Sequence, residues 1–273
     1  MNGFRLLLVA ALVVAVAFLA LPVVAIFLRV PPTELVEQLA DERARDALVV
    51  SLRTSLVAHA LVVGVGTPAA YLLATRSFRG RSLVVSLLEL PLVLPPAVAG
   101  LGLLAAFGRS GLLGRELDAL GLQIPFTQLA VVLAICFVAS PFYVRAAIAA
   151  FAAVDVDVVA AARTLGAGEA RTFARVVLPL AAGGLGAGST VAFARGLGEF
   201  GATIMFAGSL PGRTQTAPLA IYDALDEAFG VALALSALLV LLSVLVLVLS
   251  KVLPRWLRSL QSSPSRAATS TSP

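Results

Sequence analysis

The sequence is poor in the side chains that usually carry out catalysis or bind metals. Its 273 residues include one cysteine, Cys136, one histidine, His59, and one lysine, Lys251. One cysteine excludes an internal disulfide, and one histidine excludes a cluster of histidine ligands around a metal. A Ser-His-Asp hydrolase needs an acidic side chain beside its histidine, and no Asp or Glu lies near His59 in the sequence. We expect His59 to be a polar residue in helix packing, Cys136 to be a small apolar filler, and the chain to have no catalytic site.

The scarcity of lysine also excludes an ATP site. A phosphate-binding loop of the form G-x-x-x-x-G-K-[ST] needs its lysine, and Lys251 follows Val248-Leu249-Ser250 instead. Any energy from nucleotide hydrolysis must therefore come from another chain.

Charged residues are few and apolar residues are abundant. Hydrophobic residues make up 60% of the chain, charged residues 13%, and the mean hydropathy is +1.01. Soluble domains are about 45–50% apolar and about 25% charged, so this composition predicts an all-α polytopic membrane protein. A bilayer needs about 20 apolar residues per helix. Six stretches reach that length: 6–28, 47–74, 83–107, 128–153, 180–206 and 228–250.

Lys and Arg residues predict the orientation. With the N-terminus inside, 12 of the 20 lie in cytoplasmic segments and 6 in outer loops, which favours both termini in the cytoplasm. The first apolar stretch has 23 residues, longer than the about 7–15 of a signal peptide's apolar region, so we expect a retained anchor. We expect one transmembrane domain over residues 1–258.

The segments between the spans differ in kind. Residues 33–46 predict a short helix on the outer surface, with Thr33 as N-cap and Leu35, Val36 and Leu39 on one face. Residues 154–179 form the longest stretch outside the membrane. The tail, 259–273, is rich in Ser, Thr, Pro and Ala and is predicted to be disordered.

Charges and glycines gather in the fifth stretch. Arg195 and Glu199 are four residues apart, which would place them on one face of a continuous helix. Structural ion pairing and lining of a pathway both remain open for them. The pair Gly184-x-x-x-Gly188 allows close helix packing, and seven glycines make this segment easy to bend. In the third stretch, Glu89 is expected to be a cap or an ion-pair partner.

The cytoplasmic segment carries a recognisable motif. Residues 155–165 and 169–177 predict two short helices, separated by Gly166-Ala167-Gly168, the second ending before Leu178-Pro179. The segment resembles the loop of ATP-binding cassette importer permeases, which reads E-A-A, three residues, G, nine residues, I-x-L-P. This chain has Ala161-Ala162, Gly166 and then Val176-Val177-Leu178-Pro179, with Ala160 where the family has glutamate.

Further stretches resemble the permeases of molybdate importers within that family. They are residues 91–96, 107–114, 197–208, 211–216 and 218–222. Sulfate permeases share the Gly-Glu-Phe-Gly-Ala core at 198–202 but differ just after it.

The resemblance implies a type I importer permease in a prokaryotic cell membrane, acting by alternating access. It implies a homodimer, a dimer of a cytoplasmic ATPase that binds ATP and magnesium, and an external molybdate-binding protein; this chain itself would bind no cofactor and no metal. The residues expected to couple to the ATPase are Ala161, Ala162, Gly166, Val176, Leu178 and Pro179. The residues expected along the pathway are Arg195, Gly198, Glu199, Gly201 and Thr203.

Other functions stay open at the level of sequence. The permease could carry sulfate or another oxyanion, because selectivity would reside mainly in the external binding protein. A secondary transporter driven by protons or sodium would use Glu89 or Glu199 as its coupling site, and it would favour an internal repeat that this chain lacks. A membrane-embedded enzyme ranks third.

Overall fold

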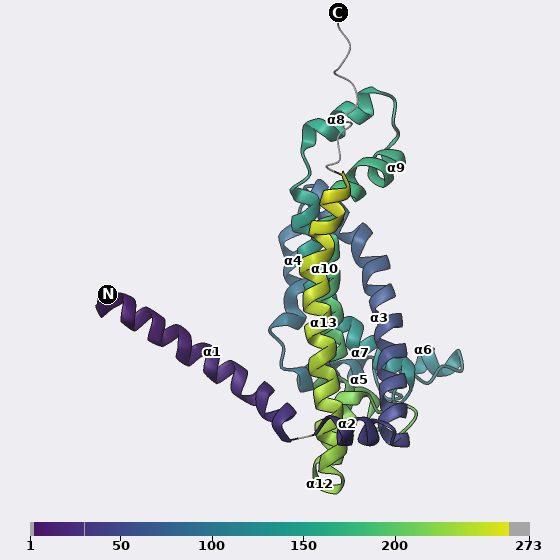
Figure 1. Ribbon diagram of the computed structural model, residues 1–273. Coiled ribbons are helices and arrows are strands. Elements are labelled where there is room, and N and C mark those ends of the chain that lie inside the picture. Colours follow the sequence, from purple (N-terminus) through teal and green to yellow (C-terminus); the bar gives the residue numbers. More distant parts are fainter. Residues whose placement is uncertain (1–2, 30, 262–273) are drawn as a thin grey trace, which may run out of the picture. The chain divides into compact units, whose positions relative to one another are not determined.

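The computed structural model describes residues 3–29 and 31–261, and every regular element in that part of the chain is a helix (Figure 1). The predicted all-α class is confirmed. The helices are α1 Gly3–Arg29, α2 Pro32–Leu39, α3 Glu42–Thr75, α4 Arg81–Glu89, the 3-10 turn η1 Leu90–Leu92, α5 Pro96–Phe107, α6 Gly114–Ala119, α7 Gln128–Ala152, α8 Val156–Thr164, α9 Glu169–Thr172, the π-helical turn η2 Phe173–Val177, α10 Leu178–Leu197, α11 Gly201–Ala207, α12 Ala217–Glu227 and α13 Phe229–Gln261.

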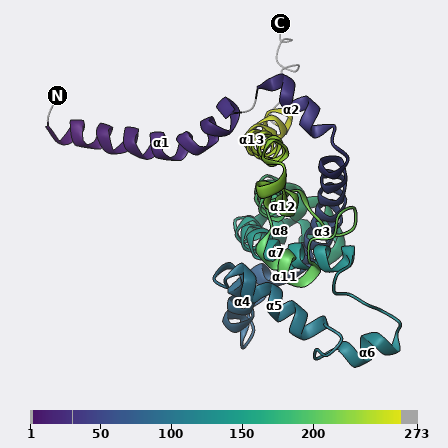
Figure 2. The same ribbon diagram turned by 90° about the horizontal axis from the view of Figure 1, so that it is seen from below.

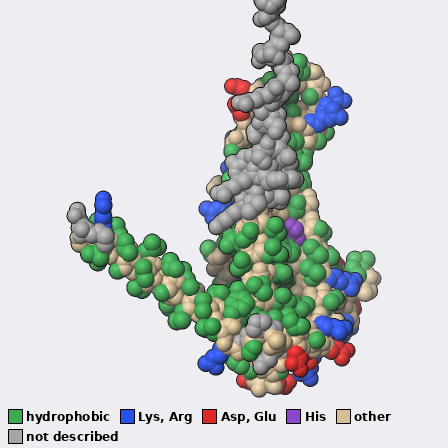
Figure 3. Space-filling view, in the orientation of Figure 1, with side chains coloured by type: hydrophobic (Ala, Val, Ile, Leu, Met, Phe, Trp, Pro, Cys, Tyr) green, Lys and Arg blue, Asp and Glu red, His purple; other side chains and the backbone are tan. Residues whose placement is uncertain are grey.

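Within the described residues, five helical segments are long and apolar enough to cross a membrane. A sixth span results if α4, η1 and α5 cross together as one broken segment. None of the described residues of α1 is buried, and the visible surface of this helix is almost wholly hydrophobic (Figure 3). Such a helix suits a lipid environment, because its backbone groups bond internally and its side chains need no water.

The third stretch is not the continuous helix over 83–107 that its composition suggests. α4 and η1 meet α5 at an angle of 113°. Pro91, Pro95 and Pro96 lack the backbone N–H that continues a helix, and Pro96 takes the first position of α5, where that N–H is not needed. Glu89 is the last residue of α4, and its Oε1 lies 3.7 Å from Nε of Arg145.

The short helix that was predicted over residues 33–46 also differs from its prediction. α2 begins at Pro32, with Pro31 and not Thr33 at the N-cap, because a proline in the first turn sets the helical φ. The helix ends at Leu39, and α3 starts at an angle to it three residues later (Figures 1 and 2). Leu39 packs on Ala44, Ala47, Ala220 and Leu235, whereas Val36 is exposed and does not share that face.

The chain forms two compact units. Of the described residues, unit 1 comprises 3–29, 31–54, 100–132 and 198–243, and unit 2 comprises 55–99, 133–197 and 244–261. In unit 1, the N–H of Ala217 at the start of α12 donates to Oγ of buried Ser51 on α3, at 2.6 Å. In unit 2, Tyr143 of α7 is 1% exposed, and its hydroxyl bonds that of Thr67 on α3 at 2.6 Å.

The lone histidine and the lone cysteine have packing roles within unit 2. Nε2 of His59 lies 2.8 Å from Oγ of Ser189 on α10, and its ring meets the edge of Phe193. Cys136 packs against the apolar core, with its Sγ 3.5 Å from the carbonyl oxygen of Ala58. Both side chains therefore join α3 to its neighbours, as the sequence predicts.

Close packing of α10 on α7 depends on two glycines of unit 2. A Cβ at Gly184 would lie 2.6 Å from Cβ of Ala150, and one at Gly188 would lie 2.5 Å from Cβ of Ala146. Gly184 and Gly188 therefore bring α10 and α7 of the same chain together, and this face of α10 is not available to a second copy.

Replacing Gly188 with alanine is expected to lower the thermal stability of the purified protein. The added methyl overpacks the contact with Ala146, which costs about 1–3 kcal/mol. The matched control is Gly186→Ala, where a Cβ meets no atom within 4 Å and helix propensity improves by up to about 1 kcal/mol. Equal melting temperatures for the two variants would contradict this packing.

Of the tail that was predicted to be disordered, residues 259–273, the structure describes only the first three residues. Helix α13 continues to Gln261, so Ser259, Leu260 and Gln261 are helical. The remainder, 262–273, lies outside the described residues.

Candidate functional site

The fifth apolar stretch breaks where the pathway residues were predicted. Helix α10 ends at Leu197, residues 198–200 are not helical, and α11 begins at Gly201. The prediction that Arg195 and Glu199 share one face of a continuous helix is therefore wrong. Gly196, Gly198 and Gly201 each weaken a helix by up to about 1 kcal/mol, which explains a break at this point.

Glu199 caps the helix that follows the break. Its side chain is buried at 2% exposure, and its Oε1 accepts the N–H of Ala202 in the first turn of α11 at 2.8 Å. A carboxylate is stabilised there because the first turn of a helix has free N–H groups and a partial positive charge. This position gives Glu199 a structural role at the start of α11.

Thr203 lies in the first turn of α11 and is fully buried. Its hydroxyl has no hydrogen-bond partner among the described residues. A buried polar group without a partner costs about 1–3 kcal/mol, so this hydroxyl is held in the fold at the expense of stability.

Helix α5 supports α11 within unit 1. A Cβ at Gly100 of α5 would lie 2.6 Å from the carbonyl oxygen of Ala202 and 2.7 Å from Cβ of Met205. The two helices are in backbone contact here, so the position of α11 depends on Gly100. Sequence reasoning missed this residue because glycines in an apolar stretch give no sign of which helix they face.

The predicted coupling segment folds as a helical hairpin of unit 2. Asp155 caps α8 by accepting the N–H of Asp157 at 2.9 Å. At its other end, the N–H of Gly166 donates to the carbonyl of Arg163, and the N–H of Ala167 donates to that of Ala162. This Schellman arrangement requires a left-handed residue, and Gly166 has φ of +84°. The spacing between Ala162 and Gly166 in the motif therefore encodes a helix stop.

The second arm of the hairpin continues without a break into the long apolar helix α10. Helix α9 continues through η2 into α10, so the predicted end before Leu178-Pro179 is wrong. Pro179 cannot donate to the residue four before it, and the wider π-helical turn just upstream accommodates that missing bond. Val176 and Leu178 are half-buried and Val177 is buried, whereas Pro179 is exposed.

Ion pairs join this hairpin to the end of α3, also within unit 2. Oε1 of Glu169 lies 3.3 Å from an Nη of Arg76, which follows α3, and 4.0 Å from an Nη of Arg163 on α8. These residues border a cavity of about 590 Å³ whose lining includes Ala160. Exposed pairs contribute about 0–1 kcal/mol each, so they orient the hairpin more than they stabilise it.

The apolar tip of the hairpin is open. Val156, the first residue of α8, is 76% exposed, and Leu165, which directly precedes the turn at Gly166, is 88% exposed. Exposed aliphatic side chains around a rigid turn are typical of a surface that packs against another protein.

Comparison with known proteins identifies the family of the chain. The sequence pattern described as "Binding-protein-dependent transport system inner membrane component" matches residues 66–259, which contain both the hairpin and the break. The chain belongs to this family. It is therefore a multi-pass membrane component of a transport system.

Several curated members of the family resemble the chain over most of its length. The molybdenum transport system permease protein ModB of Mycobacterium tuberculosis is 44% identical over 86% of this chain and 89% of its own. The ModB protein of Escherichia coli K12 is 41% identical over 77% of this chain and 92% of its own. A probable molybdenum ABC transporter permease of Haloferax volcanii is 40% identical over 86% and 85%.

Solved structures show the same fold at low sequence identity. A chain of a bacterial ABC transporter that imports alginate matches with a TM-score of 0.71 and 15% identity, covering 94% of this chain and 95% of that one. A chain of the MetNI methionine ABC transporter matches with a TM-score of 0.56 and 18% identity, covering 78% of this chain and 93% of that one. The predicted ABC importer permease fold is confirmed.

Proposed function

We propose that this chain is the membrane-spanning subunit of an ATP-driven importer that carries molybdate, and also tungstate, from an external binding protein into the cytoplasm. The observation that carries the proposal is identity of 40–44% with molybdenum permeases over most of both chains. Sulfate is the alternative cargo, because the Gly-Glu-Phe-Gly-Ala core alone does not separate these oxyanions.

The partners follow from what the chain contains. It has no phosphate-binding loop, so ATP and magnesium belong to a separate cytoplasmic ATPase. The exposed tip of the hairpin, with Gly166 at its turn, is the surface that this ATPase would contact. On this proposal the hairpin and both termini would lie in the cytoplasm, and the excess of Lys and Arg in those segments supports this orientation.

We also propose that two copies form the permease. The glycine pair at 184 and 188 gives no support to this proposal, because α7 occupies that face. It rests on the resemblance to other importers of the family, in which two membrane subunits enclose one pathway.

The pathway would include the break between α10 and α11. Closing of the ATPase would move the hairpin and, through η2, the continuous helix α10 up to Arg195. Helix α11, separated by Gly198 and Glu199, would move differently and expose Gly201 and Thr203. Molybdate is a dianion, and a pathway that offers hydrogen-bond donors without a deep positive site binds it weakly enough to release it.

Reconstitution tests the division of labour. The chain in liposomes, alone and under a proton gradient, is expected to take up no molybdate, whereas the chain with its ATPase and binding protein takes it up when ATP is supplied. Uptake by the chain alone would overturn the proposal and establish a secondary transporter, with Glu89 or Glu199 as the first residues to test.

A further inference from the structure

The hairpin of unit 2 contacts a second long helix besides α10. Phe173, in the π-helical turn η2, packs on Tyr71 near the end of α3, with 4.7 Å between the ring centroids. Phe151 of α7, which is 3% exposed, meets Tyr71 edge to face at 5.4 Å and lies 6.1 Å from Phe173. Aromatic pairs at these distances contribute about 0.5–1.5 kcal/mol beyond the burial of their surface. The base of the hairpin is therefore packed on α3.

An ion pair joins the start of α9 to the same helix. Oε1 of Glu169 lies 3.3 Å from an Nη of Arg76. The backbone N–H of Arg76 donates to the carbonyl of Leu72 at 3.0 Å, so Arg76 continues the last turn of α3. Glu169 is the first residue of α9, where the N–H of Thr172 donates to the carbonyl of Gly168 at 2.9 Å. Each partner of the pair therefore belongs to a helical turn.

The carboxylate of Glu169 links three elements of unit 2. Besides Arg76 beyond α3, it faces an Nη of Arg163 on α8 at 4.0 Å. Both arginines border the cavity of about 590 Å³, and Glu169 is the only acid among the described residues that line it. Ala160, where the motif of the family has glutamate, borders the same cavity. Glu169 thus provides the negative charge that faces these arginines.

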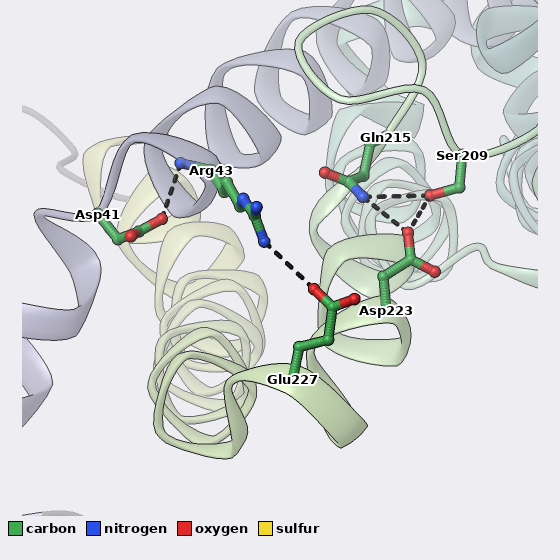
Figure 4. Close-up of polar contacts among 6 residues, drawn as sticks. All are labelled: Asp41, Arg43, Ser209, Gln215, Asp223 and Glu227. Carbon is green, nitrogen blue, oxygen red and sulfur yellow. Dashed lines mark hydrogen bonds and ion pairs between the residues drawn. The ribbon is translucent and has the colours of Figure 1, made fainter.

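The start of α3 carries a comparable ion pair that does not involve the hairpin (Figure 4). Within unit 1, an Nη of Arg43 lies 3.4 Å from Oε2 of Glu227 on α12. These two side chains are each 74% exposed, against 63% for Arg76 and 75% for Glu169. The two pairs have similar lengths and exposure, so solvent screens them to a similar degree. Glu227 is therefore a matched control for Glu169.

We propose that Glu169 is a positioning residue that passes the movement of the hairpin to α3 as well as to α10. The inference rests on the proposed function, in which the ATPase moves the hairpin. The packed rings at the base of the hairpin act on α3 near Tyr71, and the pair at Glu169 fixes the angle between α9 and the end of α3. The movement continues to α4, because Nε of Arg81, its first residue, donates to the carbonyl of Leu73 on α3 at 2.7 Å.

Hydrogen exchange of the full chain in nanodiscs tests this contact without any transport. Glu169→Gln keeps the size of the side chain and removes its charge. Exposed pairs contribute about 0–1 kcal/mol each, so we expect backbone exchange over residues 156–172 to become about threefold faster. Glu227→Gln, which breaks the comparable pair of unit 1, should leave exchange in that range unchanged. Equal exchange over 156–172 in Glu169→Gln and the wild-type chain would overturn the inference.

The number of molybdate ions imported per ATP hydrolysed tests transmission in the complete complex. In proteoliposomes with the ATPase and the binding protein, Glu169→Arg is expected to lower this ratio about fivefold, because three arginines then face one another. Adding Arg76→Glu restores an ion pair of reversed sign between α9 and the end of α3. The double variant should recover at least about half of the wild-type ratio, a rescue that a general loss of stability would not show.

The remaining outcomes separate this inference from its alternatives. A double variant as poorly coupled as Glu169→Arg alone overturns it, because the pair with Arg76 would then have no part in transmission. Loss of the ATPase from the purified Glu169→Arg complex also overturns it, because Glu169 would then contact the ATPase directly. If the wild-type complex hydrolyses ATP in response to the binding protein but imports no molybdate, the proposed function fails, while hydrogen exchange still decides whether Glu169 holds the hairpin.

Discussion

Replacing Gly166 with valine is expected to reduce ATP-driven uptake at least tenfold while the protein remains in the membrane. Gly166 has φ of +84°, a conformation that costs an L-residue about 1–2 kcal/mol and a β-branched residue more. A Cβ there would meet no atom within 4 Å, so the cost arises from the backbone and not from crowding. Relief of the strain breaks the two hydrogen bonds that stop α8, and the apolar tip then loses its shape.

The matched control for this variant is Gly168→Val. Gly168 lies two residues away, has no atom within 4 Å of an added Cβ, and has φ of −66°, which valine adopts readily. The Gly168 variant should retain most uptake, and both variants should show the same basal ATPase activity in the separate cassette. Normal coupled uptake by Gly166→Val would contradict the assignment of the hairpin as the coupling surface.

Replacing Gly100 with alanine is expected to reduce uptake by an order of magnitude or more. The new Cβ would lie 2.6 Å from the carbonyl oxygen of Ala202 and 2.9 Å from its Cα, so the backbone of α5 or α11 must move. Overpacking of this kind costs about 1–3 kcal/mol. Because α11 carries Thr203 and is capped by Glu199, the displacement falls on the segment proposed to open the pathway.

Gly102→Ala is the control for that variant. Gly102 lies in the same helix, and a Cβ there would meet no atom within 4 Å. Uptake and ATPase activity of both variants should be measured in the same reconstituted complex, with protein amounts matched by quantitative blotting. If Gly100→Ala transports as well as Gly102→Ala, the position of α11 does not control the pathway.

The fold was predictable from the sequence because membrane spans depend on local composition. An apolar stretch of about 20 residues can be recognised as a candidate span from its own composition, without knowledge of what packs against it. The hairpin was predictable for a related reason, since an N-cap aspartate at 155 and a glycine at 166 act within one or two turns of helix. Both kinds of signal are short-range.

The details that were mispredicted depend on competition between local signals. Composition favours a continuous helix through residue 206, but three glycines and the capping carboxylate of Glu199 together favour a new start at Gly201. Thr33 is a good N-cap, yet Pro31-Pro32 fixes the start of α2 two residues earlier. Neither outcome follows from one residue taken alone.

Other features could not be predicted because they join distant parts of the chain. Glu169 and Arg76 are 93 residues apart, and Gly100 meets Ala202 across more than 100 residues. Ser209 and Gln215 both donate hydrogen bonds to Asp223 within a span of only 14 residues, but these partners emerge only when the loop 208–216 is folded (Figure 4). A single sequence without contacts gives no sign that these polar residues converge.

Competition for uptake tests the central claim most directly. Proteoliposomes that contain this chain and its ATPase, supplied with ATP and the binding protein, are given radiolabelled molybdate with an excess of unlabelled tungstate or sulfate. The account predicts that uptake requires all three proteins, that tungstate competes strongly and that sulfate does not. Equal competition by sulfate would contradict the assignment to molybdate, and uptake without the ATPase would contradict the assignment as an ATP-driven permease.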